Sequence, residues 1–259
     1  MDSRTRELGL GDDGRVLIDT TFDVRTDAGG KDPDTYSATL CRYHQLLWNK
    51  PLPSGVPFDL VPDGRPPYYF RHSSEFGQFI LSSDAFIPAY TRYGVPRSII
   101  EQLPAADHDY FNMIGYTIGG LILWPASRID GMWTINQARG CLGSKIGDRM
   151  DLTLECIRRH YRGETSPLGD PQAGCGDVLA RYADFFAAFE DFRGYVDFWL
   201  LQDMVTDDYS AVRFFAPFDD FTTRAIPQDL DTYLEYRRRS IEFIQARNTR
   251  IDQLKIDSG

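Results

Sequence analysis

Residues 115–162, GYTIGGLILWPASRIDGMWTINQARGCLGSKIGDRMDLTLECIRRHYR, contain the clearest secondary-structure signals of the chain. Residues 115–124 are almost continuously apolar and run into Pro125, which predicts a buried strand at the centre of a sheet. Residues 132–135 are expected to form its hairpin partner. From residue 149 the apolar side chains recur at helical spacing, which predicts a helix over 149–162. Its packing face would consist of Met150, Leu154, Ile157 and Tyr161.

Strand signals precede this stretch and helix signals follow it. Short strands are predicted at 16–18, 22–24, 68–71 and 78–81, and a helix at 36–48, capped by Asp34. The six prolines of 51–67 exclude regular structure there. Further helices are predicted at 178–189, 195–205 and 228–251. The order indicates an α+β fold in which a small mixed or antiparallel sheet in the N-terminal half packs against a mainly helical C-terminal half.

The domain organisation follows from length and composition. Residues 1–14 read as a flexible leader, and 15–259 as one α+β domain with a β-rich lobe, 15–147, and a helical lobe, 148–256. With 28 basic and 38 acidic residues the net charge is −10, which argues against a surface that binds duplex nucleic acid or a membrane. Four cysteines without a CxxC motif predict free thiols, no zinc centre and a cytoplasmic location.

The first candidate site is the glycine-rich connection over 135–149. It carries Asn136, Arg139, Lys145 and Arg149, and residues 128–162 hold seven basic against four acidic residues in an otherwise acidic chain. A glycine-rich strand-to-helix turn directs backbone amides at one point, where the helix N-terminus favours an anion. These residues are therefore candidates for phosphate binding, although the spacing fits neither a Walker loop nor GxGxxG. The alternative is a structural loop anchored by arginine, with Asp148 capping the helix.

The polar side of the predicted helix supplies the catalytic candidates. Glu155 would act as a general base beside phosphates held by arginine, with Asp151 nearby. The alternative is a solvated helix face on which Glu155 pairs with Arg158 and Arg159, three and four residues later.

Two further groups of residues carry weaker chemical signals. An early acidic run could bind Mg²⁺ at low probability, although capping and turn duty also explain its members, Asp19, Asp23, Asp27, Asp32 and Asp34. Cys41 and His44 lie one helical turn apart and could form a thiolate–imidazolium pair, but buried cysteine is commonly a small apolar residue.

Several long strings are similar to an uncharacterised bacterial protein family. They are FDVRTDAGGKDPDTYS (22–37), YHQLLWNKPLP (43–53), YTIGGLILWP (116–125), INQARG (135–140), DRMDLTLECIRRHY (148–161) and GYVDFWLLQD (194–203). The resemblance extends over about 22–251. It implies no activity, fold or catalytic residue.

Three functions from different classes remain open. The chain could be a nucleotide-directed enzyme that transfers or hydrolyses part of a phosphorylated small molecule such as a nucleotide or NAD. It could use the same basic loop as a non-catalytic anion- or partner-binding protein. It could also be a structural protein whose aromatic C-terminal helices form a homodimer. The enzyme hypothesis requires a carboxylate within reach of the arginine cluster.

Overall fold

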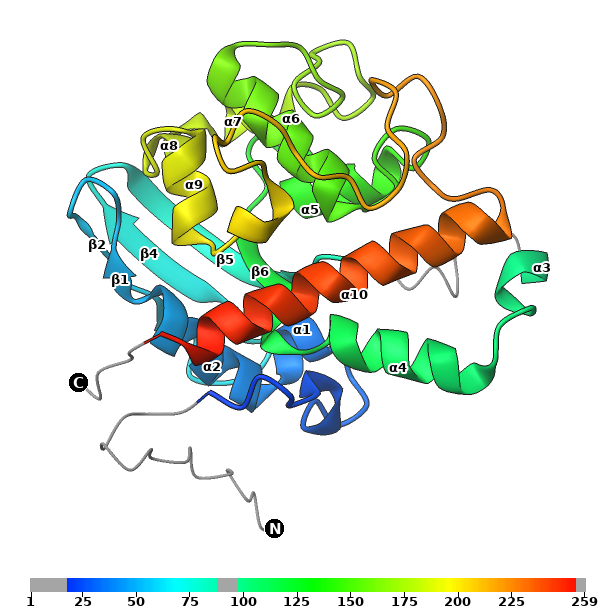
Figure 1. Ribbon diagram of the computed structural model, residues 1–259. Coiled ribbons are helices and arrows are strands. Elements are labelled where there is room, and N and C mark those ends of the chain that lie inside the picture. Colours follow the sequence, from blue (N-terminus) through cyan, green and yellow to red (C-terminus); the bar gives the residue numbers. More distant parts are fainter. Residues whose placement is uncertain (1–17, 88–96, 255–259) are drawn as a thin grey trace.

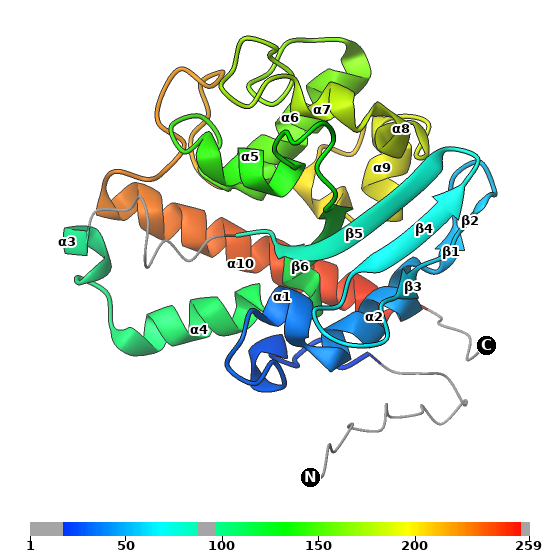
Figure 2. The same ribbon diagram turned by 180° about the vertical axis from the view of Figure 1, so that it is seen from behind.

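A four-stranded antiparallel sheet and one long helix, α10, organise the molecule (Figures 1 and 2). The computed structural model describes residues 18–87 and 97–254, so the expected leader 1–14 and most of the expected strand 16–18 lie outside it. The strands of the described residues are β1 Lys50–Pro51, β2 Pro57–Phe58, β3 Val61–Pro62, β4 Phe70–Ser74, β5 Gly77–Ala85 and β6 Leu121–Pro125. The α-helices are α1 Pro33–Tyr36, α2 Ala38–Trp48, α3 Arg97–Ile100, α4 Ala105–Gly115, α5 Ile135–Cys141, α6 Met150–Arg162, α7 Val178–Arg181, α8 Ala183–Ala187, α9 Phe192–Phe198 and α10 Leu230–Asp252. Short 3₁₀ turns are η1 Val24–Thr26, η2 Ile118–Gly120 and η3 Gln202–Met204.

The α+β prediction is confirmed, with the sheet in the N-terminal half and helices after it. The strands follow the order β3-β4-β5-β6, and β1 and β2 form a separate two-stranded ribbon. β4 and β5 are a hairpin, in the register Phe70↔Leu81 to Ser74↔Gly77. β5 continues past this hairpin to pair with β6, where Ala85 lies opposite Leu121. The far end of β5 is thereby fixed beside the helical half of the chain.

The predicted strand over 115–124 is wrong in extent and position. β6 has only five residues and lies at the end of the sheet, although every one of them is buried. Before it, α4 ends at Gly115 and η2 turns the chain at Gly119 and Gly120. A side chain on Gly119 would lie 2.3 Å from Oδ1 of Asn248 on α10. These glycines therefore permit close packing of the backbone, and their apolar neighbours are buried without being extended.

The connection over 135–149 also differs from its prediction. Residues 132–135 do not pair with β6, because Thr134 begins helix α5 through a capping box with Gln137. The glycine-rich segment therefore joins helix α5 to helix α6 and is not a strand-to-helix turn. Asp148, expected to cap α6, lies one residue before the N-cap, Arg149, and the helix has no side-chain cap.

The helix predicted over 149–162 is confirmed as α6. It begins at Met150 and ends at Gly163, whose φ of 66° forms the left-handed C-cap. Its polar side is not solvated as expected, because the first eight residues of α6 are all buried, Asp151 and Glu155 included. Charged side chains inside the protein must be paired, so their partners decide what they can do.

The remaining helices agree with the predictions in place more than in length. The segment 178–189 divides into α7 and α8, and 195–205 contains most of α9 and then η3. At the N-terminal end, residues 22–24 form no strand, because Asp23 caps η1 and Val24 begins it. Asp32 and Ser37, not Asp34, cap α1 and α2. Asp34 is thus free of the capping role expected for it.

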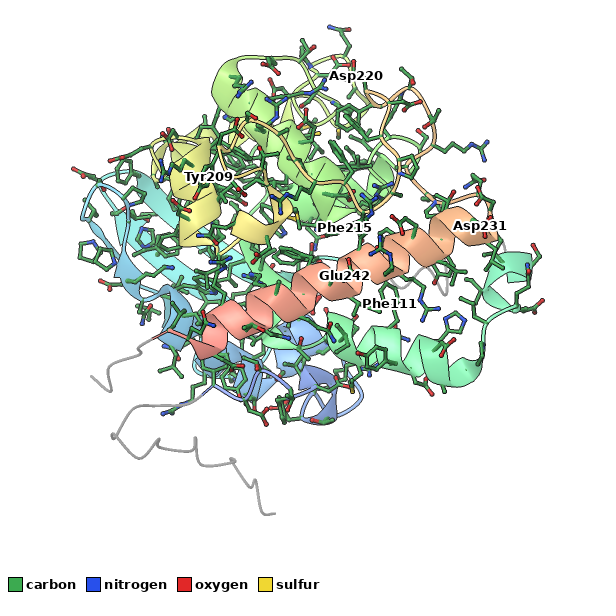
Figure 3. All side chains as sticks on the ribbon, viewed as in Figure 1. Phe111, Tyr209, Phe215, Asp220, Asp231 and Glu242 are labelled. Atoms are coloured by element: carbon green, nitrogen blue, oxygen red, sulfur yellow. The ribbon has the colours of Figure 1, made fainter. Side chains whose placement is uncertain are left out.

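Helix α10 lies between α4 on one side and the group α5–α9 on the other (Figures 1 and 2). Phe111 of α4 and Phe215 pack against Tyr236 from opposite sides of α10, each with ring centroids 6.2 Å from it (Figure 3). Buried Arg247 of α10 donates hydrogen bonds to the carbonyl oxygens of Gly119, Leu121 and Trp199. This helix therefore joins the end of the sheet to the helical half. Among the described residues no helix has the length and apolarity that crossing a bilayer requires.

Candidate functional site: an acidic centre around Arg139

Arg139 is completely buried although it lies on α5 in a segment rich in exposed residues. Its guanidinium bonds to three segments. Nε donates to Oγ1 of Thr153 at 2.9 Å, Nη2 donates to the carbonyl of Asp148 at 2.9 Å, and Nη1 donates to the carboxylate of Asp84. A planar group held at all three nitrogens has one orientation, so Arg139 gives the surrounding carboxyl groups a fixed positive charge.

Two carboxyl groups, Asp84 and Asp148, contact this guanidinium, and their charges act on a third carboxyl group, that of Asp34. Asp84 is the second-last residue of β5 and has a side chain only 12% exposed. Asp148 precedes α6 with φ 59°, and its Oδ1 lies 3.5 Å from Nη2 of Arg139. Asp34 comes from α1, which packs on β5, and its Oδ1 is buried without a hydrogen-bond partner in the described structure. We call Asp34, Asp84, Asp148 and Arg139 the acidic centre.

Burial shifts the pKa values of all three carboxyl groups of the acidic centre upward. Burial raises the pKa of Asp34 well above its usual range, and the charges of Asp84, Asp32 and Asp148 raise it further. Burial also raises the pKa of Asp84 to about 7, against the opposing effect of Arg139. Burial raises the pKa of Asp148 as well, again opposed by Arg139. One guanidinium carries a single positive charge against three carboxyl groups, and burial keeps the pKa of the most buried of them, Asp84, near neutrality.

The buried imidazole of His44 holds β5 in place at Ser83, next to Asp84. Nε1 of Trp48 donates to Nδ1 of His44 at 3.0 Å, so the other imidazole nitrogen carries the proton and donates to Oγ of Ser83 at 2.9 Å. Burial, with the charge of Arg247, lowers the pKa of His44 to about 3, so the ring is neutral. Burial raises the pKa of Cys41 to about 11. The thiolate–imidazolium pair of Cys41 and His44 therefore has no support, and His44 instead orients the strand.

The two residues proposed as catalytic bind other partners. Asp151 is fully buried, and its carboxylate accepts hydrogen bonds from Arg149 Nε at 3.1 Å and from the backbone N–H of Phe215 at 2.7 Å. Glu155 is 3% exposed and accepts two hydrogen bonds from Arg158 and one from Arg159, all between 2.7 and 2.8 Å. Although burial opposes it, these bonds lower the pKa of Glu155. Because the oxygens of both carboxylates already accept hydrogen bonds from within the protein, neither is placed to act as a general base, and both residues stay predictions without geometric support.

The four phosphate-binding candidates are not brought together either. Arg149 is 2% exposed and donates to the carbonyl of Ala225 at 2.7 Å in addition to its pair with Asp151. Lys145 donates to the carbonyl of Phe221 at 2.5 Å. Both line a cavity of about 10 Å³, which is the size of a single water molecule. Half-buried Asn136 precedes buried Arg139 on α5. Phosphate binding by these residues stays a prediction, and their contacts fit an arginine-anchored structure.

The early acidic run reaches the acidic centre at one end only. Asp19 accepts a hydrogen bond from Thr21, Asp23 pairs with Arg25, and Asp27 accepts a bond from the backbone of Thr39. Asp32 caps α1, and its charge acts on Asp34 and Asp84. In the described part of the chain no three histidine, cysteine or carboxylate side chains gather as metal ligands. The four cysteines are free thiols.

Sequence reasoning found Arg139 but not the carboxyl groups around it. The sequence predicts Asp34 and Asp148 as helix caps and gives Asp84 no role in a site. One signal in the sequence could have indicated a different role for Asp34. Asp32 and Ser37 lie within three residues of it and are equally favourable N-cap residues, so Asp34 was not needed as a cap.

Comparisons with known proteins identify a family and no activity. Neither the curated proteins nor the solved structures contain a match to this chain. One family model, described as a family of unknown function (DUF6994), matches residues 18–251, which include every residue of the acidic centre. The chain belongs to this family of unknown function.

Proposed function

We propose that the protein is an enzyme that uses the acidic centre for general acid–base catalysis on a nucleotide-like substrate, by transfer or hydrolysis. The observation that carries the proposal is the buried, unpartnered Oδ1 of Asp34 beside Asp84, whose pKa is raised to about 7. A buried acceptor without a partner is costly to stability, and such costs concentrate where a ligand supplies the missing bond. An acid with a pKa near 7 is well matched to proton transfer at neutral pH.

The charge of the acidic centre restricts which part of a substrate can enter it. Three carboxyl groups and one guanidinium repel phosphate whenever two or more carboxyls are ionised. Sugar hydroxyls can instead donate to Oδ1 of Asp34, and a cationic ring nitrogen gains from the negative charge. NAD carries such a nitrogen at the bond between nicotinamide and ribose. Within the class of phosphorylated small molecules, we therefore place the sugar or its glycosidic bond at the acidic centre, and the phosphates away from it.

The proposed roles follow from the contacts. Asp84 gives or takes the proton, because its pKa lies in the working range and Arg139 fixes its orientation. Asp34 accepts a hydrogen bond from the substrate or stabilises positive charge that develops in the transition state. Arg139 contacts both Asp84 and Asp148 and is bonded at all three of its nitrogens, so its contribution is to hold the carboxyl groups in place.

The experiment incubates the protein with NAD and a panel of nucleoside phosphates and follows products by mass spectrometry. Asp84→Asn and Asp34→Asn should lower the rate by about 100-fold or more, because each removes the acid–base group or its partner. Asp63→Asn is the matched control, since Asp63 is a partly exposed carboxylate paired with Arg71 on the surface. Absence of conversion of every panel member, or a folded Asp84→Asn variant with the wild-type rate, would contradict the proposal.

A further inference from the structure

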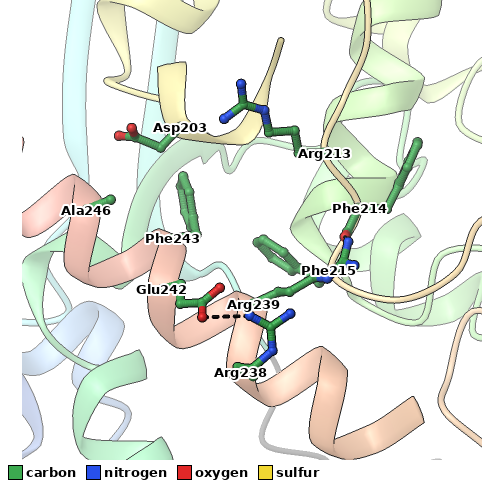
Figure 4. A pocket seen from close by; sticks show the side chains of 9 residues that line it. All are labelled: Asp203, Arg213, Phe214, Phe215, Arg238, Arg239, Glu242, Phe243 and Ala246. Carbon is green, nitrogen blue, oxygen red and sulfur yellow. Dashed lines mark hydrogen bonds and ion pairs between the residues drawn. The ribbon is translucent and has the colours of Figure 1, made fainter.

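A second ligand site is indicated by a cavity of about 440 Å³ between α10 and the chain over 203–215. Its volume lies in the range of small-molecule pockets, roughly 300–1,000 Å³. Its floor is apolar, since Phe215 and Phe243 are buried and half-buried Ala246 lies beside them. Its rim carries three arginines, Arg213 on one wall and Arg238 and Arg239 on α10 (Figure 4). An apolar floor with a basic rim is the arrangement that binds an anion with a flat apolar body.

The two carboxylates of the cavity are already neutralised by arginines. Asp203 accepts three hydrogen bonds from Arg250, between 2.9 and 3.2 Å, on the side of α10 next to η3. Glu242 accepts from Nη1 of Arg238 at 2.7 Å, one turn along the helix (Figure 4). Ion pairs of this kind leave little net negative charge to oppose an anionic ligand.

Arg213 and Arg239, in contrast, keep N–H groups for a ligand. A guanidinium has five N–H donors. Arg213 donates from Nη2 to Asp207, a fully exposed carboxylate, so this bond contributes little and is easily exchanged. Arg239 donates from Nε to Glu235 and from Nη1 to the carbonyl of Phe214, which leaves Nη2 at the rim. The side chains of Arg213 and Arg239 are 54% and 47% exposed. Two exposed guanidinium groups on opposite walls can bind one phosphate or carboxylate together.

We propose that this cavity binds an aromatic anion, its ring on Phe215 and Phe243 and its phosphate or carboxylate between Arg213 and Arg239. The proposal does not depend on the acidic centre, which lies in other elements and has the opposite charge. A ring in the cavity would lie on buried phenyl faces, and an anion at its rim would replace the weak bond to Asp207 by charge-assisted bonds.

Phenyl phosphate is the probe, with inorganic phosphate and benzoate beside it, and calorimetry measures binding up to about 1 mM. Phenyl phosphate should bind more tightly than inorganic phosphate, because only the former reaches the apolar floor. Arg213→Ala and Arg239→Ala should each weaken its binding about tenfold or more. Benzoate tests which anionic group the ligand carries. If benzoate binds as tightly as phenyl phosphate, the site accepts a carboxylate as readily as a phosphate.

Two further variants keep the test decisive. Arg71→Ala is the matched control, because it removes one exposed arginine from β4, which does not line the cavity, and should leave binding unchanged. Ala246→Glu places a carboxylate on the cavity floor and should abolish binding. Because Ala246 is only half-buried, the thermal unfolding temperature of the protein should stay nearly unchanged. Equal binding in Arg213→Ala and Arg71→Ala, or no binding of phenyl phosphate to the wild type, would overturn the proposal. Equal affinity for inorganic phosphate and phenyl phosphate would overturn the aromatic ligand class.

Discussion

Arg139 shows how a residue chosen for one role can have another. Its position in a basic, glycine-rich segment suggested an exposed phosphate ligand, and the structure buries it completely among Asp84, Asp148 and Thr153. The hydrogen bonds to Thr153, Asp84 and Asp148 hold this guanidinium inside the protein, so its contacts fit a structural cation, and phosphate binding by Arg139 stays a prediction. The proposed acid–base chemistry accordingly rests on the carboxyl groups that Arg139 contacts.

Arg139→Ala should therefore unfold the protein more easily, by roughly 3–5 kcal/mol, because it leaves buried carboxyl groups without their cation. The loss should be smaller at pH 5 than at pH 8, since protonated carboxyl groups no longer need that cation. Urea unfolding at both pH values measures it. Arg71→Ala, which removes an exposed arginine with a side chain 67% exposed, should cost less than about 1 kcal/mol. Equal losses in the two variants would show that Arg139 is not a structural cation.

Helix α6 was predictable because its signal is local. Apolar residues at helical spacing place Met150, Leu154 and Ile157 on one face, and Gly163 ends the helix in the left-handed conformation. The burial of Asp151 was not predictable, because its carboxylate accepts a hydrogen bond from the backbone of Phe215, which lies 64 residues further along the chain. Periodicity indicates which side is apolar, but it does not show that a second layer of chain covers the polar side.

Glycine-to-alanine substitutions near the C-terminal ends of α5 and α6 should change stability in opposite directions. Gly163→Ala should destabilise the protein by about 1–2 kcal/mol, because φ is 66° there and the surrounding space is open, so conformation alone decides. Gly140→Ala lies within α5, also in open space and without a positive φ, and should be neutral or stabilise by up to about 1 kcal/mol. Thermal and urea unfolding measure both. Destabilisation of the same size in both variants would contradict the assigned helix ends.

β6 shows why an apolar run alone is ambiguous. Residues 115–120 carry no charge and lead directly into the strand, yet Gly120 has no room for a side chain because the carbonyl of Gly115 would lie 2.2 Å from it. The contact of Gly119 with Asn248 joins positions 129 residues apart. Single-sequence patterns carry no such distances, so the fold class could be predicted while the extent of this strand could not.

Across the whole molecule, buried charge makes stability depend on pH in two opposing ways. A carboxyl group whose pKa is raised on folding stabilises the protein below its unfolded value, near 3.8, and this stabilisation is lost as pH rises through the folded value, about 7 for Asp84. His44 acts in the opposite direction, because its pKa falls to about 3 on folding and its stabilisation is lost as pH falls below about 6.5. A comparison with a variant is needed to separate them.

Asp34→Asn removes one of the raised groups and leaves His44 unchanged. Between pH 4 and pH 8 the wild type should lose more stability, relative to its value at pH 4, than the variant does. Relative to the wild type, Asp34→Asn should be more stable at pH 8 than it is at pH 4, because it lacks a carboxyl group whose pKa burial raises. Urea midpoints across this range measure both effects. Parallel pH profiles for the two proteins would contradict a raised pKa at Asp34.

The most direct measurement is the titration of the aspartate side-chain carboxyl carbons by nuclear magnetic resonance, with Asp34→Asn and Asp84→Asn to assign the signals. The acidic centre predicts that Asp84 titrates near pH 7, that Asp34 titrates well above the usual aspartate range, and that each variant lowers the midpoint of the other group. Titration of both groups near pH 4, unaffected by the neighbouring substitution, would contradict the acidic centre and with it the proposed acid–base function.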